Sequence, residues 1–166
     1  MATQNLLQRL DTAEDTTGSS ADASNRRIEE VFIASAALTE GDFVSLDLSQ
    51  ATASDIALHV DLLDAADACP VGVVIADAAQ GENVRVCIRG VIEAKVDGSG
   101  VNIAIGDALF VGATAGKAEN KKFRTDLGDG TGTTTGNVDP VQAIAAIALE
   151  ASTADESIKV FVVNNF

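Results

Sequence analysis

The sequence has no tryptophan and no tyrosine, and six phenylalanines bring its aromatic content to only 4%. Hydrophobic residues nevertheless make up 46% of the chain, so the core has to be built from Val, Ile, Leu, Ala and Phe. Such side chains suit closely packed β-strands. The missing rings argue against a site that stacks sugars or nucleobases, because such sites generally use exposed aromatic residues.

Basic residues are also scarce. Eleven Lys and Arg stand against 25 Asp and Glu, which gives a formal net charge of −14. A chain with this charge repels phosphate backbones and anionic lipid surfaces. The start of the chain lacks the basic and apolar segments of a signal peptide, and no stretch approaches the ~20 apolar residues that span a bilayer. We therefore expect no direct nucleic-acid partner, no membrane partner and synthesis in a cytosol-like compartment.

Potential metal ligands are few and poorly spaced. Cys69 and Cys87 belong to no CxxC pair, and the single His59 cannot complete a zinc site with them. We expect two buried free thiols. The loop 126–136 contains Asp126 and Asp129 among glycines, but it lacks the late Glu of a calcium loop and the Lys-Ser/Thr of a P-loop. The sequence therefore predicts no metal and no cofactor, and the loop is interpreted as a surface loop.

Catalytic motifs are missing in the same way. His59 lies in an expected strand at 56–60, and the sequence contains neither G-x-S-x-G nor HExxH. The nearby Asp61 and Asp64 are expected by chance in a chain with 25 acids. We therefore interpret the chain as a protein that is not an enzyme.

The chain divides at about residue 30. Residues 1–30 form a leading segment in which Leu6, Leu7 and Leu10 have helical spacing and a Thr/Ser/Gly/Asp run follows. Such a run buries too little apolar surface to order itself. We interpret residues 1–30 as an extended arm, which is either a free tail or ordered by a neighbour, and residues 31–166 as a β-domain.

Short alternating segments fill the second region. Val, Ile, Leu and Phe alternate with other residues at 43–48, 84–88, 101–105 and 158–162, and Gly-Asp, Gly-Glu or Asp-Gly pairs supply turns between them. Two passages also resemble each other, one beginning at Gly41-Asp42 and the other at Gly106-Asp107. They define two similar halves at about 38–96 and 101–166. The match aligns 84–86 with 158–160, and 77–78 with 150–151 if one residue is inserted.

The repeat also bears on an ambiguous stretch, residues 141–149. Its Ala, Leu and Glu favour a helix by propensity, whereas its position in the second half favours a strand. We predict a strand. The expected fold is mainly β, a compact β-barrel or sandwich built from two similar halves, with an extended N-terminal arm.

Several stretches of turn and packing residues are recognisable together, namely Leu38–Val44, Val71–Ala78, Gly81–Val86, Arg89–Val91, Ile105–Leu109, Ala115–Lys117 and Ala148–Ala151. In these stretches the sequence resembles the capsid decoration (head cement) proteins of tailed bacteriophages. The resemblance covers roughly residues 38–163.

The resemblance implies a structural virion protein, made in the host bacterial cytoplasm, that binds the outer surface of an icosahedral capsid and stabilises it by bridging major capsid subunits. It also implies a homotrimer. Other virion parts (a tail tube, a fibre base or a head fibre) and a trimeric β-fold enzyme are the alternatives. The residues predicted to contact the capsid or a neighbouring copy are apolar arm residues and basic residues, namely Leu6, Leu7, Leu10, Arg26, Arg27, Lys121, Lys122 and Arg124.

Overall fold

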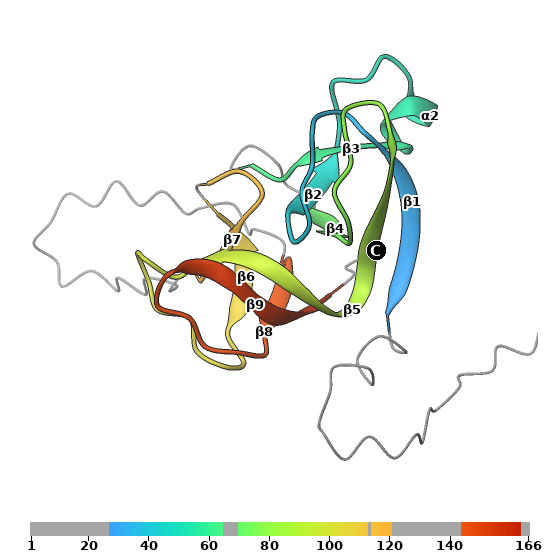
Figure 1. The fold of residues 1–166 in the computed structure, drawn as a ribbon. Coiled ribbons are helices and arrows are strands. Elements are labelled where there is room, and N and C mark those ends of the chain that lie inside the picture. The colour runs from blue at the N-terminus through green and yellow to red at the C-terminus, as the bar shows by residue number, and fades with distance from the viewer. Residues whose placement is uncertain (1–26, 65–69, 113, 121–143, 164–166) are drawn as a thin grey trace, which may run out of the picture.

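The computed structural model describes residues 27–64, 70–112, 114–120 and 144–163. Within these ranges the chain forms nine strands and one short helix (Figure 1). In chain order the elements are β1 (Ile28–Ala34), β2 (Phe43–Leu46), α2 (Ala53–Ile56), β3 (His59–Leu62), β4 (Pro70–Val74), β5 (Asn83–Asp97), β6 (Ala108–Val111), β7 (Ala118–Glu119), β8 (Ala146–Ala148) and β9 (Asp155–Val162). The mainly β class predicted from the sequence is confirmed.

The described strands close into two five-stranded barrels that share β5. In the first barrel the order is β1-β3-β2-β4-β5, and β1 pairs with β5 to close it. In the second barrel the order is β5-β7-β6-β8-β9, and β5 pairs with β9 to close it. Figure 1 shows β5 running from one barrel into the other, with β1 alongside one part and β9 alongside the other. Closure leaves few unpaired strand edges among these elements.

The same turn opens both barrels. The Asp42 carboxylate accepts a 2.8 Å hydrogen bond from the Thr39 backbone N, and the Asp107 carboxylate accepts one of 2.8 Å from the Ala104 backbone N. The glycine before each aspartate has a positive φ, 85° at Gly41 and 91° at Gly106, which favours glycine. The next backbone hydrogen bonds run from these turns to β4 and to β8 in the same pattern. The two halves predicted from the sequence are therefore repeated in the backbone.

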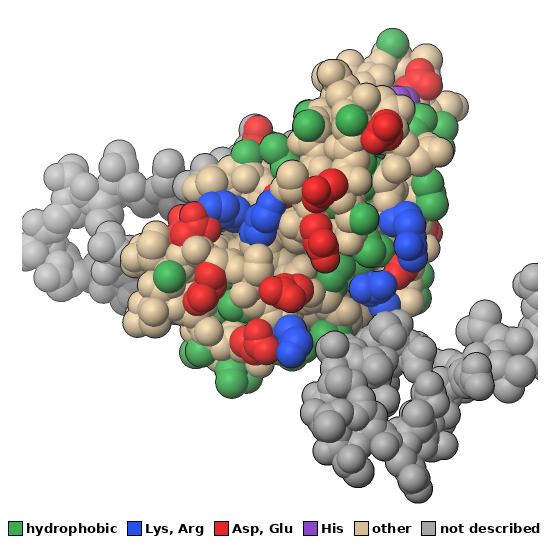
Figure 2. Space-filling view, in the orientation of Figure 1, with side chains coloured by type: hydrophobic (Ala, Val, Ile, Leu, Met, Phe, Trp, Pro, Cys, Tyr) green, Lys and Arg blue, Asp and Glu red, His purple; other side chains and the backbone are tan. Residues whose placement is uncertain are grey.

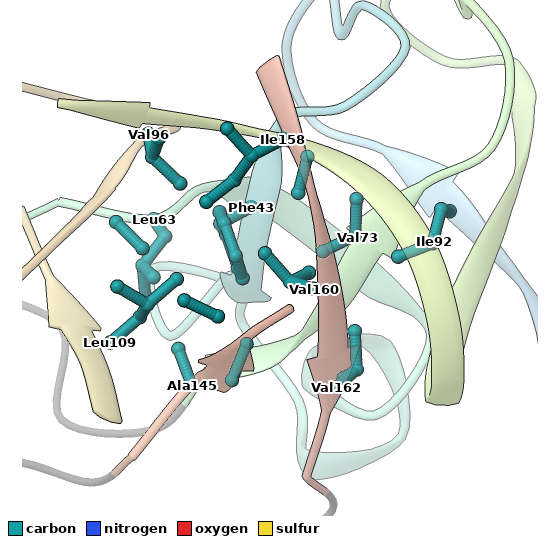
Figure 3. Close-up of a cluster of buried hydrophobic side chains, with 14 of the residues drawn as sticks. Phe43, Leu63, Val73, Ile92, Val96, Leu109, Ala145, Ile158, Val160 and Val162 are labelled. Atoms are coloured by element: carbon teal, nitrogen blue, oxygen red, sulfur yellow. The ribbon is translucent and has the colours of Figure 1, made fainter. Parts of the chain in front are cut away.

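The side-chain cores follow the repeat as well. Each barrel interior is aliphatic, and the first is lined by residues such as Phe32, Val44 and Val86. The second cluster takes Leu109 and Val160 from its own strands. It also contains four residues from the part of the chain that builds the first barrel, Phe43, Leu63, Val73 and Cys87 (Figure 3 labels three of them). The two barrels therefore pack as one body, because one core contains side chains from both.

Several sequence predictions are confirmed at the level of single elements. The alternating segments 43–48, 84–88 and 158–162 contain or overlap β2, β5 and β9. Residues 146–148 form β8, so the strand interpretation of this stretch is confirmed over its described part. The strand β1 already begins at Ile28, inside the segment assigned to the arm, and residues 1–26 lie outside the described residues.

Three predictions are wrong in detail. Residues 101–105 form no strand and make one bridge, from Ile103 to Ser152. Residues 53–56 form the helix α2, capped by the Thr52 side chain, so the strand expected at 56–60 begins only at His59. The bridge from Leu38 to Ala78 is the counterpart of the one from Ile103 to Ser152, so Ala78 matches Ser152 and the halves align here without an inserted residue.

Candidate interaction surface

Of the residues predicted to make contacts, Arg27 is the one that the structure describes. It immediately precedes β1. The others lie outside the described residues, namely Leu6, Leu7, Leu10, Arg26, Lys121, Lys122 and Arg124. The surface around Arg27 is therefore the part of the predicted interface whose geometry can be described.

Arg27 belongs to a group of charges on the outer face of the first barrel. Its Nη2 lies 2.6 Å from Glu29 Oε1, and Arg85 Nη2 contacts Glu29 Oε2. Antiparallel pairing of β1 with β5 sets this arrangement, because it places Val31 opposite Arg85 and Ile28 opposite Arg89. The exposed Arg89 makes no ion pair with a described residue. Two guanidinium groups therefore contact one carboxylate, and Arg89 adds a third positive charge on the same pair of strands.

The Glu29 carboxylate is held in its charged form. Burial of Glu29 opposes ionisation, but hydrogen bonds and positive charge from Arg85 and Arg27 outweigh it and lower the pKa of Glu29. Its side chain is 23% exposed, whereas that of Arg85 is 60% exposed. Arg85 therefore presents most of its guanidinium group to solvent even while it contacts Glu29.

Two aliphatic side chains lie among these arginines. Ile28 is 51% exposed and Val31 is 61% exposed. A register shift between Ile28 and Glu29 interrupts the alternation of β1. The side chains of these two consecutive residues are therefore both at least partly exposed. We call this surface, made of Arg27, Ile28, Glu29, Val31, Arg85 and Arg89, the basic face. Arginine beside exposed aliphatic surface is a composition typical of protein interfaces.

Sequence reasoning missed Arg85 and Arg89 as members of this surface. The alternation at 84–88 did place Arg85 on the face opposite the core residues Val84 and Val86. Its proximity to Arg27 depends on the pairing of β1 with β5, which are separated by about fifty residues of sequence, and no local pattern specifies that pairing.

The described lysines are arranged differently. Lys95 Nζ lies 2.7 Å from Asp42 Oδ1, and Lys159 Nζ lies 3.4 Å from Glu150 Oε1. Lys117 contacts the Asp155 carboxylate. Figure 2 shows Lys and Arg side chains in small separate groups with acidic side chains close by. Excess positive charge among the described residues is therefore concentrated on the basic face.

A shallow depression of about 430 Å³ lies around His59 on the first barrel. His59 Nδ1 lies 2.8 Å from the Asp55 carbonyl oxygen. The Asp47 carboxylate accepts hydrogen bonds from Ser35 Oγ (2.6 Å), Ser49 Oγ (2.6 Å) and Gln50 Nε2 (2.6 Å), and these bonds lower the pKa of Asp47 well below its ordinary value. The serines therefore hold a charged carboxylate in place and are not paired with a histidine base.

Among the residues with described positions, neither the free cysteine nor the possible metal ligands form a catalytic arrangement. Burial raises the pKa of the Cys87 thiol to about 11, so it stays protonated and unreactive. This confirms the predicted buried free thiol at Cys87, while Cys69 lies outside the described residues. Within the described ranges no three His, Cys, Asp or Glu side chains gather as metal ligands. No described helix is long and apolar enough to cross a membrane.

Comparison with known proteins bears on this surface. A family model described as "Phage cement protein" matches residues 23–163. The chain belongs to the phage cement protein family. The resemblance noted in the sequence is thereby confirmed, and this cement protein is a structural protein of a phage virion. The matched residues begin before Arg27 and include the whole basic face.

One solved structure has a similar fold. It is "the crystal structure of head fiber gp8.5 N base in bacteriophage phi29", with a TM-score of 0.51 and 15% sequence identity over 83% of this chain and 95% of that chain. At this identity the likeness concerns the fold. A comparison with curated proteins gives no match to the cement protein.

Proposed function

We propose that this phage cement protein decorates the outer surface of an icosahedral capsid and stabilises it by bridging major capsid subunits. The observation that carries the proposal is the match of the family model to residues 23–163. Two closed barrels with a shared core supply a stiff body for such a role. The family is a structural one, which supports a protein that acts by binding and not by catalysis.

The basic face is our candidate for the part of the protein that contacts the shell. The whole chain carries a charge of −14, so its approach to another protein is favoured where the local charge is reversed. Arg85 and Arg89 are exposed there, next to Ile28 and Val31. A partner surface that combines carboxylates with apolar side chains would match both components.

The arm is the second proposed contact. Leu6, Leu7 and Leu10 would anchor it on an adjacent subunit, and Arg26, which precedes Arg27 in the sequence, would add a charged contact. Ordering an arm costs about 1–2 kcal/mol per residue in backbone entropy, so each arm would bind weakly. Three arms on one homotrimer would raise the effective concentration and offset this cost. Lys121, Lys122 and Arg124 remain further candidate contacts.

Binding to purified empty shells tests the function. The protein is mixed with expanded shells and with their unexpanded precursors, and the bound fraction is measured after sedimentation. We expect binding to expanded shells. Protein that stays in the supernatant with both kinds of shell would contradict shell decoration.

Charge reversal then tests the basic face. The variant Arg85→Glu/Arg89→Glu should bind shells at least about ten times more weakly, because two attractive contacts become repulsive. The control Lys117→Glu/Lys159→Glu makes the same change in net charge on the second half. Equal loss in both variants would mean that only net charge matters and would remove the basic face from the proposal.

A fibre base is the second candidate function. The fold likeness to the base of a head fibre favours it over a tail tube or a complete fibre. Electron micrographs of the purified protein with shells separate the two, because a decoration protein gives discrete particles on the shell surface and a fibre base carries an elongated projection.

A further inference from the structure

An apolar row crosses the outside of the second barrel. Ala108 of β6 pairs with Ile147 of β8, Ile147 pairs with Phe161 of β9, and Phe161 pairs with Val91 of β5. These side chains alternate with core residues, so they point away from the barrel interior. Ile147 is 37% exposed, and Leu149, the next outward residue after β8, is 38% exposed. We call these five residues the outer row.

At four of its five positions the outer row has an apolar counterpart in the first half, and there it is covered; the counterpart of Val91 is Glu29. The counterparts of Ala108, Ile147 and Phe161 in the repeat are Phe43, Val73 and Cys87, which pair across β2, β4 and β5 in the same way. All three are 0% exposed and belong to the core cluster of the second barrel. Ile75, the counterpart of Leu149, packs against that cluster as well. The second half therefore covers the row of the first half.

We propose that the first half of a second copy of this chain covers the outer row, in a head-to-tail contact that extends the contact between the two halves. This inference rests on the proposed self-association and specifies its surface. The occupant follows from the repeat, because the second half covers the first row and the first half has the same fold as the second. The row contains no charged side chain, which matters between copies that each carry −14.

The contact between the two halves of one chain also indicates which surface of the second copy would cover the outer row. We call it the opposite surface. Gly116 lies against the covered row of the first half: Phe43 N donates to Gly116 O (2.9 Å), and Gly116 N donates to Leu63 O (2.8 Å). The strand β3 pairs with β1 in the same parallel register in which β7 pairs with β5. Leu58, just before β3, is therefore the counterpart of Gly116, just before β7. Leu58 is 51% exposed. We therefore place the opposite surface around Leu58.

The contact within one chain and the proposed contact between two copies differ in one respect. In the second barrel Lys95 N donates to Gly41 O of the turn that opens the first barrel (2.9 Å), whereas in the first barrel Ile33 N donates to Leu58 O (2.8 Å). The strands β1 and β3 are thus already joined at this point. In the proposed contact, the outer row of the neighbouring copy consequently lies over Leu58 and does not insert between β1 and β3. A contact between two different surfaces closes into a ring when the rotation allows it, which is compatible with a homotrimer.

Two variants that each disable one surface test the proposal. Ile147→Asp places a carboxylate in the outer row, and Leu58→Asp places one in the opposite surface. Each should weaken self-association by roughly 100-fold or more, because an unpaired charge would be buried against an acidic neighbour. Thr153→Asp, on the exposed turn before β9, is the matched control and should leave association unchanged. Mass is measured by analytical ultracentrifugation against the 17.0 kDa monomer, and circular dichroism checks the fold.

Mixing the two variants tests the head-to-tail geometry. Each variant keeps one intact surface, so an equimolar mixture should form a complex of one Ile147→Asp chain with one Leu58→Asp chain. A mixture that stays monomeric, an Ile147→Asp chain that associates like the wild type, or a monomeric wild type would each overturn the proposal. Wild-type protein that is monomeric but binds shells would leave shell decoration intact. Associating protein that ignores shells would instead contradict the proposed function.

Discussion

At the scale of single residues, carboxylates that accept hydrogen bonds define the turns of this protein. Asp42 and Asp107 close the same turn in the two halves. Asp47 holds the segment after β2 through Ser35, Ser49 and Gln50. Part of the acidity of the chain therefore has a structural role, beyond the solubility expected from its net charge.

The Asp47 contacts predict a dependence of stability on pH. Hydrogen bonds from Ser35, Ser49 and Gln50 lower the pKa of Asp47, so the unfolded state takes up a proton at higher pH than the folded state does. The stabilisation is present above the ordinary pKa of 3.8 and is lost as the pH falls towards the folded pKa. Asp47→Asn should therefore lower the urea midpoint at neutral pH, and the difference from wild type should shrink below about pH 4.

Ser35→Ala serves as the partial control for this prediction, since it removes the largest of the contributions to the lowered pKa. It should show a smaller difference with the same dependence on pH. A difference between wild type and Asp47→Asn that stays constant from neutral to acidic pH would show that the carboxylate charge contributes nothing.

Gly72 gives a second prediction at this scale. A Cβ at this position would lie 2.3 Å from the Cys87 carbonyl oxygen, a backbone atom that cannot move cheaply. Gly72→Ala should lower the free energy of unfolding by roughly 1–3 kcal/mol, measured by urea denaturation. Gly100→Ala is the control, because a Cβ there meets no atom within 4 Å, and it should be close to neutral. Equal stability of the two variants would contradict the close approach of β4 to β5.

At the scale of elements, β5 connects the two barrels. Its residues up to Arg89 pair with β1, and from Gly90 onward they pair with β9. Gly90 has a φ of 118°, a conformation that L side chains rarely adopt. The glycine therefore lies at the residue where the strand leaves one barrel and enters the next.

Gly90→Ala should consequently destabilise the protein by about 1–3 kcal/mol through backbone strain. The reason differs from that at Gly72, because here the backbone conformation and not a close contact excludes a side chain. Thermal unfolding followed by circular dichroism measures the change. A melting temperature equal to that of Gly100→Ala would show that the crossing needs no glycine.

The comparison of predicted and observed elements also belongs at this scale. Alternation identified the segments in β5 and β9 because most of each strand is half-buried, with one face in a core. The strand β2 was identified as well although both of its faces are buried, with Val44 in the first core and Phe43 in the second. Residues 101–105 show the same alternation, yet only Ile103 is buried and bridged, because the chain turns at Gly106 before it can pair further. The helix α2 depends on a local cap from Thr52, a signal that the apolar pattern at 56–60 obscured.

At the scale of the whole molecule, the sequence repeat predicted two similar halves but not how they share strands and cores. Turn glycines and aspartates recur along the chain, so they can be found by comparing the sequence with itself. The sharing of β5, the covering of Phe43 and Val73 by the second half, and the meeting of Arg27 with Arg85 all depend on pairings between distant segments. Such pairings are set by the packing of the complete chain and leave no local signal.

The shared core predicts that the two barrels unfold together. Phe43 belongs to β2 of the first barrel but is buried in the core of the second, with an exposure of 0%. Phe43→Ala should cost about 3–5 kcal/mol, because it removes a large side chain from a core with little room to collapse. Since that core joins the two barrels, amide hydrogen exchange should accelerate to the same extent in β2 and in β9, which belong to different barrels. Val31→Ala, at a position 61% exposed, should change neither. Faster exchange confined to β2, with β9 unchanged, would show that each barrel holds its structure independently.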